Sequence, residues 1–163
     1  MKKALILLLA LLLITPAFAE TYPPATEPPT RDYKYDDYYT LILQDGDLDP
    51  EIVCQTIWAM IDGAVGEKDT IREVSLENGT LTITVTWPDD APSPLTNGMY
   101  AQTRASGITD AILDYEELDE YWTSLHLVFP GAEATFTPDM AQDDGYGRYI
   151  DLLLIMEQIP DSL

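Results

Sequence analysis

The sequence has few of the side chains on which common catalytic and metal sites depend. Its 163 residues include one Cys and one His, and eight Lys or Arg stand against 29 Asp or Glu. A single cysteine excludes an intramolecular disulfide and any site built from a cysteine pair. The chain also lacks a glycine-rich phosphate loop, a His and Glu pair on one helical turn and a Gly-x-Ser-x-Gly elbow.

The scarcity of cations restricts the partners of the protein. The formal net charge is −21, and such a field repels nucleic-acid phosphates and anionic lipid surfaces. We therefore expect no nucleic-acid partner, whereas a protein, a neutral ligand or a cationic ligand remains open. The acidity fits either a saline habitat or a solvated surface that keeps an exported protein soluble, and we favour the second interpretation.

The chain begins with a pattern typical of a bacterial secretory signal peptide. Lys2 and Lys3 precede an apolar run at 4–14, which is followed by the small-residue site Ala17-Phe18-Ala19. The run is shorter than the about 20 apolar residues that a membrane-spanning helix needs. We expect cleavage after residue 19, a mature chain that starts at Glu20 with a charge of −23, and a secreted or extracytoplasmic location without a membrane span. Because position 20 is not Cys, the sequence predicts no lipid anchor at this junction.

Residues 20–39 form a Pro/Tyr/Asp-rich region that the sequence predicts to lie outside the folded domain. The part from Glu20 to Asp32 contains four prolines and little apolar surface, which favours an extended spacer. The part at 33–39 is rich in tyrosine and aspartate and is expected either to pack as an arm or to continue into a short edge strand. Residues 40–163 are long enough for one domain with its own core.

The folded region is predicted to be α+β. Two alternating runs around Asn78-Gly79 are the strongest short-range hairpin signal, and Leu81, Ile83, Val85 and Trp87 are expected to face the core. The first predicted helix begins at Pro50, is capped by Asp49 and ends at Gly63 or Gly66. Strands at 71–77 and 80–87 and a second helix at about 99–118 follow. The last predicted elements are strands at 122–129 and 133–137 and a closing helix through 146–154 that ends before Pro160. This α-β-β-α-β-β(-α) order predicts a four- or five-stranded, mainly antiparallel sheet with helices on one face.

Cys54 lies in a segment with helical periodicity. Apolar residues recur at 53, 57, 60, 61 and 64, the spacing of a buried helical face. We therefore interpret Cys54 as a small core residue, since free cysteine is among the most buried residue types.

The segment Asp45-Gly46-Asp47-Leu48-Asp49 resembles the start of a calcium-binding loop, because carboxylates stand at alternate positions. The sixth position is Pro50 instead of Gly, and the twelfth is Thr56 instead of a bidentate Glu. We expect no cofactor on this ground, and a calcium-stabilised surface domain with Asp45, Asp47 and Asp49 as ligands remains an alternative.

A second acidic cluster suggests another alternative. Glu116, Glu117, Asp119 and Glu120 follow Asp110 and Asp114 on the predicted second helix. Paired carboxylates can flank a sugar bond in a glycoside hydrolase. A solvated helix face explains the same pattern, and we favour that explanation because acids are numerous throughout the chain.

The remaining candidate site is the sheet face opposite the core. If Leu125 and Leu127 face inward, alternation places the neighbouring polar side chains on the other face. The candidate ligand-binding residues are Thr82, Thr84, Thr86, Ser124, His126 and Thr135. Threonine also suits an exposed strand without any ligand. The sequence thus predicts a small exported binding or interaction domain of unknown ligand without catalytic residues, with an extracytoplasmic carboxylate-dependent hydrolase as the alternative.

Overall fold

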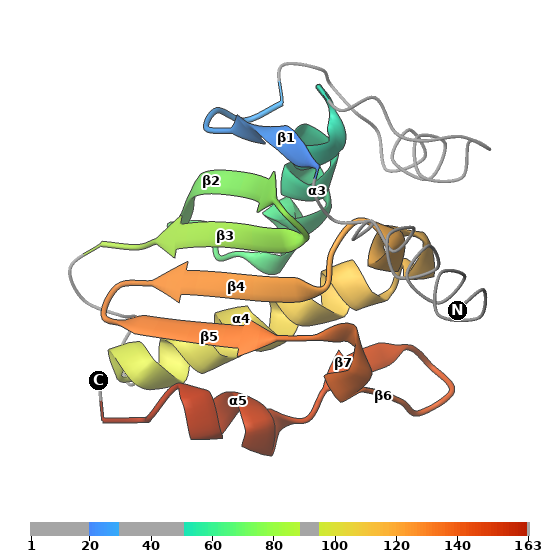
Figure 1. The fold of residues 1–163 in the computed structure, drawn as a ribbon. Coiled ribbons are helices and arrows are strands. Elements are labelled where there is room, and N and C mark those ends of the chain that lie inside the picture. Colours follow the sequence, from blue (N-terminus) through green and yellow to red (C-terminus); the bar gives the residue numbers. More distant parts are fainter. Residues whose placement is uncertain (1–19, 30–50, 89–94, 163) are drawn as a thin grey trace, which may run out of the picture.

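A five-stranded sheet forms the centre of the molecule. The computed structural model describes residues 20–29, 51–88 and 95–162 (Figure 1). The strand order is β1-β2-β3-β4-β5, and every neighbouring pair is antiparallel except β3 and β4, which are parallel. The predicted α+β class is confirmed. The strands are β1 (Thr21–Ala25), β2 (Thr70–Glu77), β3 (Thr80–Thr86), β4 (Ser124–Phe129) and β5 (Ala132–Phe136).

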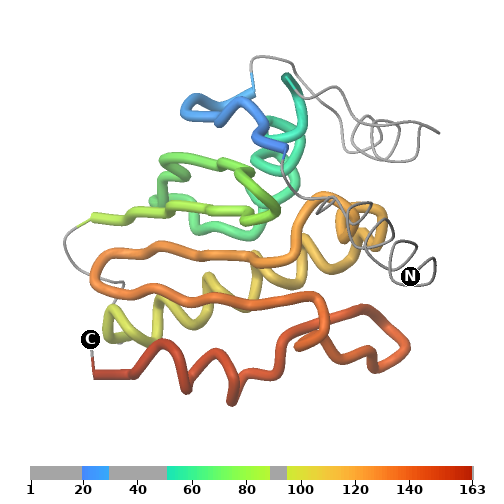
Figure 2. Tube along the Cα trace, in the orientation of Figure 1, coloured from blue at the N-terminus to red at the C-terminus, as the bar shows by residue number. Residues whose placement is uncertain are grey.

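Helices cover one face of this sheet. The tube in Figure 2 shows α3 (Val53–Ile61) and α4 (Asn97–Leu113) behind the strands, while α5 (Leu152–Gln158) runs beside β5. Helix α4 connects β3 to β4, as a parallel pair requires a crossover connection. The short 3₁₀ helices are η1 (Asp62–Ala64), η2 (Glu116–Glu120) and η3 (Pro138–Met140). None of the helices in the described ranges combines the length and the apolar character needed to cross a membrane.

The hairpin between β2 and β3 forms where the sequence predicts it. Asn78 and Gly79 have φ values of 51° and 77°, the left-handed conformation that a two-residue type I′ turn requires. Leu81, Ile83 and Val85 are fully buried. The alternation of β3 therefore orients its apolar side toward α3 and α4.

The ends of the helices differ from the prediction. Helix α3 begins at Val53, and its N-cap Ile52 makes no side-chain cap; the predicted cap at Asp49-Pro50 lies outside the described residues. Helix α4 is capped by Thr96, whose hydroxyl accepts a hydrogen bond from Met99 N at 3.1 Å. It ends at Leu113, before the acidic run.

Gly107 does not interrupt α4. A Cβ atom at this position would lie 3.2 Å from the Ala64 carbonyl oxygen, which is closer than ordinary van der Waals contact. The missing side chain therefore allows α4 and η1 to approach each other closely, and this contact offsets the cost of about 1 kcal/mol for glycine inside a helix.

The N-terminal segment is part of the sheet, and the prediction of a spacer is wrong for this part of the chain. Residues 21–25 form β1 and pair with β2, so that Thr21 faces Glu77 and Ala25 faces Val74, with an irregularity between Tyr22 and Ala25. Pro23 and Pro24 fit this position because an edge strand tolerates residues without an N–H group. The proline content that favours a spacer in the sequence is thus equally suited to an edge strand.

The closing helix is shorter than predicted. Residues 148–150, expected in its first part, instead form β7 (Arg148–Ile150), which pairs with β6 (Ala141–Asp143), and α5 begins only at Leu152. Asp143 and Asp144 accept hydrogen bonds from the backbone N–H groups of Gly145 and Tyr146 at 2.7 and 2.9 Å. These hydrogen bonds from aspartate side chains to the backbone form Asx turns. They stabilise a hairpin where the sequence predicted the start of a helix.

Cys54 is a core residue, as predicted. It is 1% exposed, in α3, and burial raises the pKa of its thiol to about 11, while backbone hydrogen bonds at Leu76 and Ala25 oppose the shift. The thiol is therefore protonated at neutral pH. Strand β1 contributes to its cover through Ala25, which is 4% exposed.

A buried ion pair fixes α4 to the loop before β2. Arg104 Nε lies 2.6 Å from Asp69 Oδ2, and the Asp69 side chain is inaccessible to solvent. Tyr100 donates to Asp69 Oδ1 at 2.8 Å, and Gly66 N donates to Asp69 Oδ2 at 2.7 Å. Partners surround this carboxylate, which is the condition under which a buried charge is tolerated. We assign the cluster a structural role.

Candidate functional site

The predicted sheet-face residues lie together on the face opposite the core. Thr82 is in register with His126, and His126 with Thr135, so three candidates form one row across β3, β4 and β5. Ser124 lies two residues from His126 on the same face, and Thr84 and Thr86 continue it along β3. The predicted orientation is therefore confirmed, whereas binding at this face stays a prediction.

This face carries charge as well as hydroxyl groups. His126 Nε2 lies 3.3 Å from Glu133 Oε2, with side-chain exposures of 31% and 70%. Arg72 Nε donates to Thr86 Oγ1 at 2.9 Å. Exposed pairs of this kind contribute about 0–1 kcal/mol. Thr86 is consequently engaged by a neighbouring strand instead of being available as a free hydroxyl.

The predicted calcium ligands lie outside the described residues. Asp45, Asp47 and Asp49 fall in the range 30–50. Elsewhere, within residues 20–29, 51–88 and 95–162, no three or more His, Cys, Asp or Glu side chains come close enough to hold a metal ion.

The second acidic cluster does not form one helix face. Asp110 lies in α4, Asp114 is the residue that caps its C-terminal end, and Glu116, Glu117, Asp119 and Glu120 belong to η2. Asp119 Oδ2 is 2.8 Å from Arg148 Nη2, with side-chain exposures of 29% and 17%. The change of direction after Leu113 separates the acids and turns some of them toward the β6–β7 hairpin.

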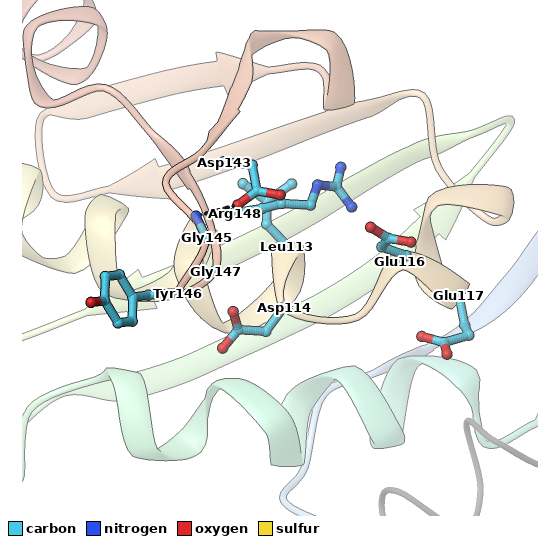
Figure 3. Close-up of a pocket in the computed structure, with 9 residues that line it drawn as sticks. All are labelled: Leu113, Asp114, Glu116, Glu117, Asp143, Gly145, Tyr146, Gly147 and Arg148. Atoms are coloured by element: carbon cyan, nitrogen blue, oxygen red, sulfur yellow. Dashed lines mark hydrogen bonds between the residues drawn. The ribbon is translucent and has the colours of Figure 1, made fainter.

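A cavity of about 460 Å³ lies where this turn meets the hairpin. We call it the acidic cavity. Figure 3 shows that its wall comes from two sides, with Arg148 extending toward Glu116 in this view and the Tyr146 ring pointing away from the other side chains. The lining residues are Leu113, Asp114, Glu116, Glu117, Asp143, Gly145, Tyr146, Gly147 and Arg148.

Four carboxylates and one cation line the acidic cavity. Arg148 is already paired with Asp119, so the cavity keeps an excess of negative charge. A Cβ atom at Gly147 would lie 2.9 Å from Asp114 Oδ1, so the hairpin passes close to the Asp114 side chain. Tyr146 is fully exposed, and an aromatic ring at the rim can contact an approaching cation through its face. The arrangement suits a positively charged ligand.

Asp110 stands one helical turn before Asp114. Burial raises the pKa of Asp110, the negative charge of Asp114 raises it further, and a hydrogen bond from Ser106 opposes the shift. Its Oδ1 atom is buried without a hydrogen-bond partner. Asp110 is not among the residues that line the acidic cavity, and its connection to the cavity is the effect of the Asp114 charge on its pKa.

A second cavity, of about 280 Å³, adjoins the first through Asp114. We call it the side cavity. It lies between the end of α3, η1 and the end of α4, and its wall combines small apolar side chains with polar surface that includes Asp114 and Tyr115. The lining residues are Ala59, Met60, Gly63, Ala64, Ala111, Asp114 and Tyr115.

The sequence indicated only part of this site. It singled out Asp114, Glu116 and Glu117, but not the five residues of the β6–β7 hairpin that close the acidic cavity. The segment Asp143-Asp144-Gly145-Tyr146-Gly147 carries a turn signal of aspartates and glycines. That signal could have predicted the hairpin.

Comparison of the chain with known protein families, curated proteins and solved structures finds no significant match.

Proposed function

We propose that this protein is an exported, non-catalytic binding domain whose ligand carries a positive charge. The observation that carries the proposal is the acidic cavity, an open depression of about 460 Å³ that four exposed acidic residues line and whose lining Arg148 is paired with Asp119. Cavities of about 300–1,000 Å³ are typical of small-ligand sites. The overall charge of −21 attracts cations toward it over long range.

The cavity is a better candidate than the predicted sheet face. None of the six sheet-face candidates lines either cavity. His126 has Glu133 beside it, and Thr86 has Arg72. A concave site surrounds more of a small ligand than an open strand surface does.

Binding of a compact cation tests the proposal. Ethylamine is titrated into the 15N-labelled protein at low and high salt, with ethanol as the neutral counterpart. We expect saturable shifts of the amides at 113–117 and 143–148 with ethylamine alone, and weaker binding at high salt because salt screens the attraction. Asp114→Asn weakens binding at least threefold, whereas Glu157→Gln, which removes the same charge from exposed α5, does not. Shifts that ethanol reproduces, or an unchanged affinity in Asp114→Asn, contradict the proposal.

The export part of the proposal rests on the first 19 residues. Two lysines, an apolar run and Ala17-Phe18-Ala19 form the pattern of a cleaved signal. Mass spectrometry of the native protein is expected to find a chain that begins at Glu20. Retention of residues 1–19 contradicts export by this route.

A carboxylate-dependent hydrolase remains the second candidate, and Asp110 supports it. A carboxyl group of raised pKa beside a second carboxyl group is the arrangement of a general acid and its partner. A series of 4-nitrophenyl glycosides is assayed with the unmodified protein and with Asp110→Asn. Turnover that Asp110→Asn abolishes replaces the binding proposal with this one, and absence of turnover leaves the binding domain as the better account.

A further inference from the structure

Helix α5 exposes an apolar face. Within the described residues six large hydrophobic side chains are exposed, and three of them belong to this seven-residue helix. Leu152 is 54% exposed, Leu153 67% and Met156 39%. With 3.6 residues per turn, positions i, i+1 and i+4 lie on one side of a helix. The three side chains therefore form one patch, which we call the α5 face.

The opposite side of α5 is already used by the fold. Ile155 is fully buried, Leu154 packs against the core, and Gln158 forms hydrogen bonds with Thr135 of β5. The helix packs against α4 and β5, and Figure 1 shows it along the outer side of the molecule. Five successive apolar residues at 152–156 surround the helix axis, a pattern typical of a helix that is buried on all sides. The described part of the chain covers only one of those sides.

The α5 face has the properties of an interaction surface. Single exposed apolar residues are common, whereas adjacent ones on one face are typical of a contact with a partner. Met140, which is also exposed, lies near the start of α5, because the next residue, Ala141, pairs with Ile150. None of the residues of the α5 face lines the acidic cavity. A partner on this face is therefore independent of the ligand proposed for the acidic cavity.

The charged residues next to the α5 face are acidic. Glu157 is exposed one turn after Leu153, and Asp151 caps the helix at its start. The only Lys or Arg after position 104 is Arg148, which is paired with Asp119. An apolar surface bordered by negative charge is complementary to apolar side chains bordered by positive charge.

A basic protein segment fits this surface better than two other occupants. A second copy of the chain would bring two acidic borders together, and like charges across an interface are unfavourable. An anionic lipid surface is repelled by the net charge of −21. Lys or Arg beside apolar side chains would cover the α5 face and pair with the acids at its border, as in an interface with an apolar centre and a polar rim.

We propose that the α5 face binds a segment of a second protein in which apolar side chains stand beside Lys or Arg. Leu152, Leu153 and Met156 supply the apolar contact, and Glu157 supplies the complementary charge. A helix with apolar side chains on one face and Lys or Arg at its borders presents this chemistry.

A designed peptide tests the inference. It has about 18 residues, since shorter isolated helices are marginal, with Leu on one helical face and Lys elsewhere. One control peptide keeps this composition but distributes Leu around the helix, and a second control replaces Lys with Glu. Calorimetry with the purified protein is expected to show that the first peptide binds at least tenfold more tightly than either control. Equal binding of the first peptide and the redistributed one overturns the inference, because charge alone then accounts for it.

Variants of α5 locate the bound peptide. Leu153→Gln and Met156→Gln are each expected to weaken binding at least fivefold and, because both side chains are exposed, to leave urea denaturation unchanged. Glu157→Lys is expected to weaken it at least threefold. Glu77→Lys makes the same change at an exposed site on β2, three strands from β5, and is expected to change the affinity less than twofold. Binding that neither glutamine variant weakens overturns the assignment to the α5 face.

Three other outcomes also overturn the proposal, because each identifies a different occupant or site. Sedimentation equilibrium that detects a dimer of the unmodified protein, but not of Leu153→Gln, assigns the face to a second copy. Binding to phosphatidylglycerol vesicles without binding to the peptide assigns it to a membrane surface. Displacement of the peptide by ethylamine, beyond the effect of sodium chloride at the same concentration, places the peptide in the acidic cavity.

Discussion

The two outer strands of the sheet are protected from further strand pairing in different ways. In β1, Pro23 and Pro24 provide no backbone N–H groups. In β5, the Gln158 side chain of α5 makes both hydrogen bonds of a partner strand: its Oε1 accepts from Thr135 N at 2.7 Å, and its Nε2 donates to Thr135 O at 2.9 Å. An unprotected edge favours aggregation. One edge is thus protected by its own sequence, and the other by a residue 23 positions away.

The β5 edge depends on the position of the chain after α5. Gln102 Nε2 donates to Ile159 O at 2.7 Å and to Asp161 Oδ1 at 2.6 Å. A Cβ atom at Gly98 would lie 2.0 Å from Pro160 O, so glycine is required where this segment crosses α4. The start of α4 therefore holds the end of α5, and α5 in turn covers the edge of β5.

The largest expected effect is at the β1 edge. Ala25→Asp places a carboxylate where the side chain is 4% exposed, against α3 and β2. We expect a loss of about 3 kcal/mol or more in the free energy of unfolding, because an unpaired buried charge is poorly tolerated. Urea denaturation measures it. Pro24→Asp introduces the same charge at an exposed position and is expected to change stability by less than about 0.5 kcal/mol.

Cys54 gives an independent readout of the same edge. With a pKa of about 11 and 1% exposure, the thiol is expected to react with a thiol reagent at pH 8 far more slowly than in the unfolded chain. Ala25→Asp increases the rate if β1 covers Cys54. Equal labelling rates in the unmodified protein and in Ala25→Asp would contradict the prediction that β1 shields Cys54 from the reagent.

A smaller effect is expected at the β5 edge. Gln158→Ala removes both hydrogen bonds to Thr135, each worth about 0.5–1.5 kcal/mol, so we expect a loss of about 1–2 kcal/mol because the site is exposed. Glu157→Ala is the neighbouring control. Sedimentation velocity is expected to show association of Gln158→Ala at high salt, where repulsion between acidic chains is screened. A variant that stays as stable as the unmodified protein and does not associate shows that Gln158 does not protect this edge.

The smallest effect concerns the sheet face beside β5. His126→Ala is expected to change the free energy of unfolding by no more than about 0.5 kcal/mol, because its contact with Glu133 is exposed. Thermal unfolding at pH 5 and pH 8 measures the change. A loss of several kcal/mol would show that His126 has a structural role that its exposure does not indicate.

Local signals in the sequence predicted much of the fold. Asn78-Gly79 specified a turn through backbone conformation, and the alternation of β3 and β4 specified which residues are buried. Pro23 and Pro24 led to the wrong prediction of a spacer, since proline suits a spacer and an edge strand alike. Tyr149 and Ile150 matched a helical period, but the turn around Gly145 and Gly147 places them in β7.

The candidate site was less predictable because it depends on contacts between distant segments. Asp114 and Asp143 stand far apart in the chain, and only the packing of β7 against α4 brings them to one cavity. The side cavity depends on the small size of Ala59 and Ala111, and small residues give no signal of the space beside them. The Gln158 contact with Thr135 has no local pattern either.

Mapping the binding of ethylamine by 15N chemical shifts tests most directly the central claim that the acidic cavity binds a cation. We expect concentration-dependent shifts of the amides at 113–117 and 143–148, which surround the acidic cavity, and unchanged amides at 82–86 and 124–128 on the sheet face. Shifts centred on Thr82, Ser124 and His126, or no saturable shifts at all, would contradict it.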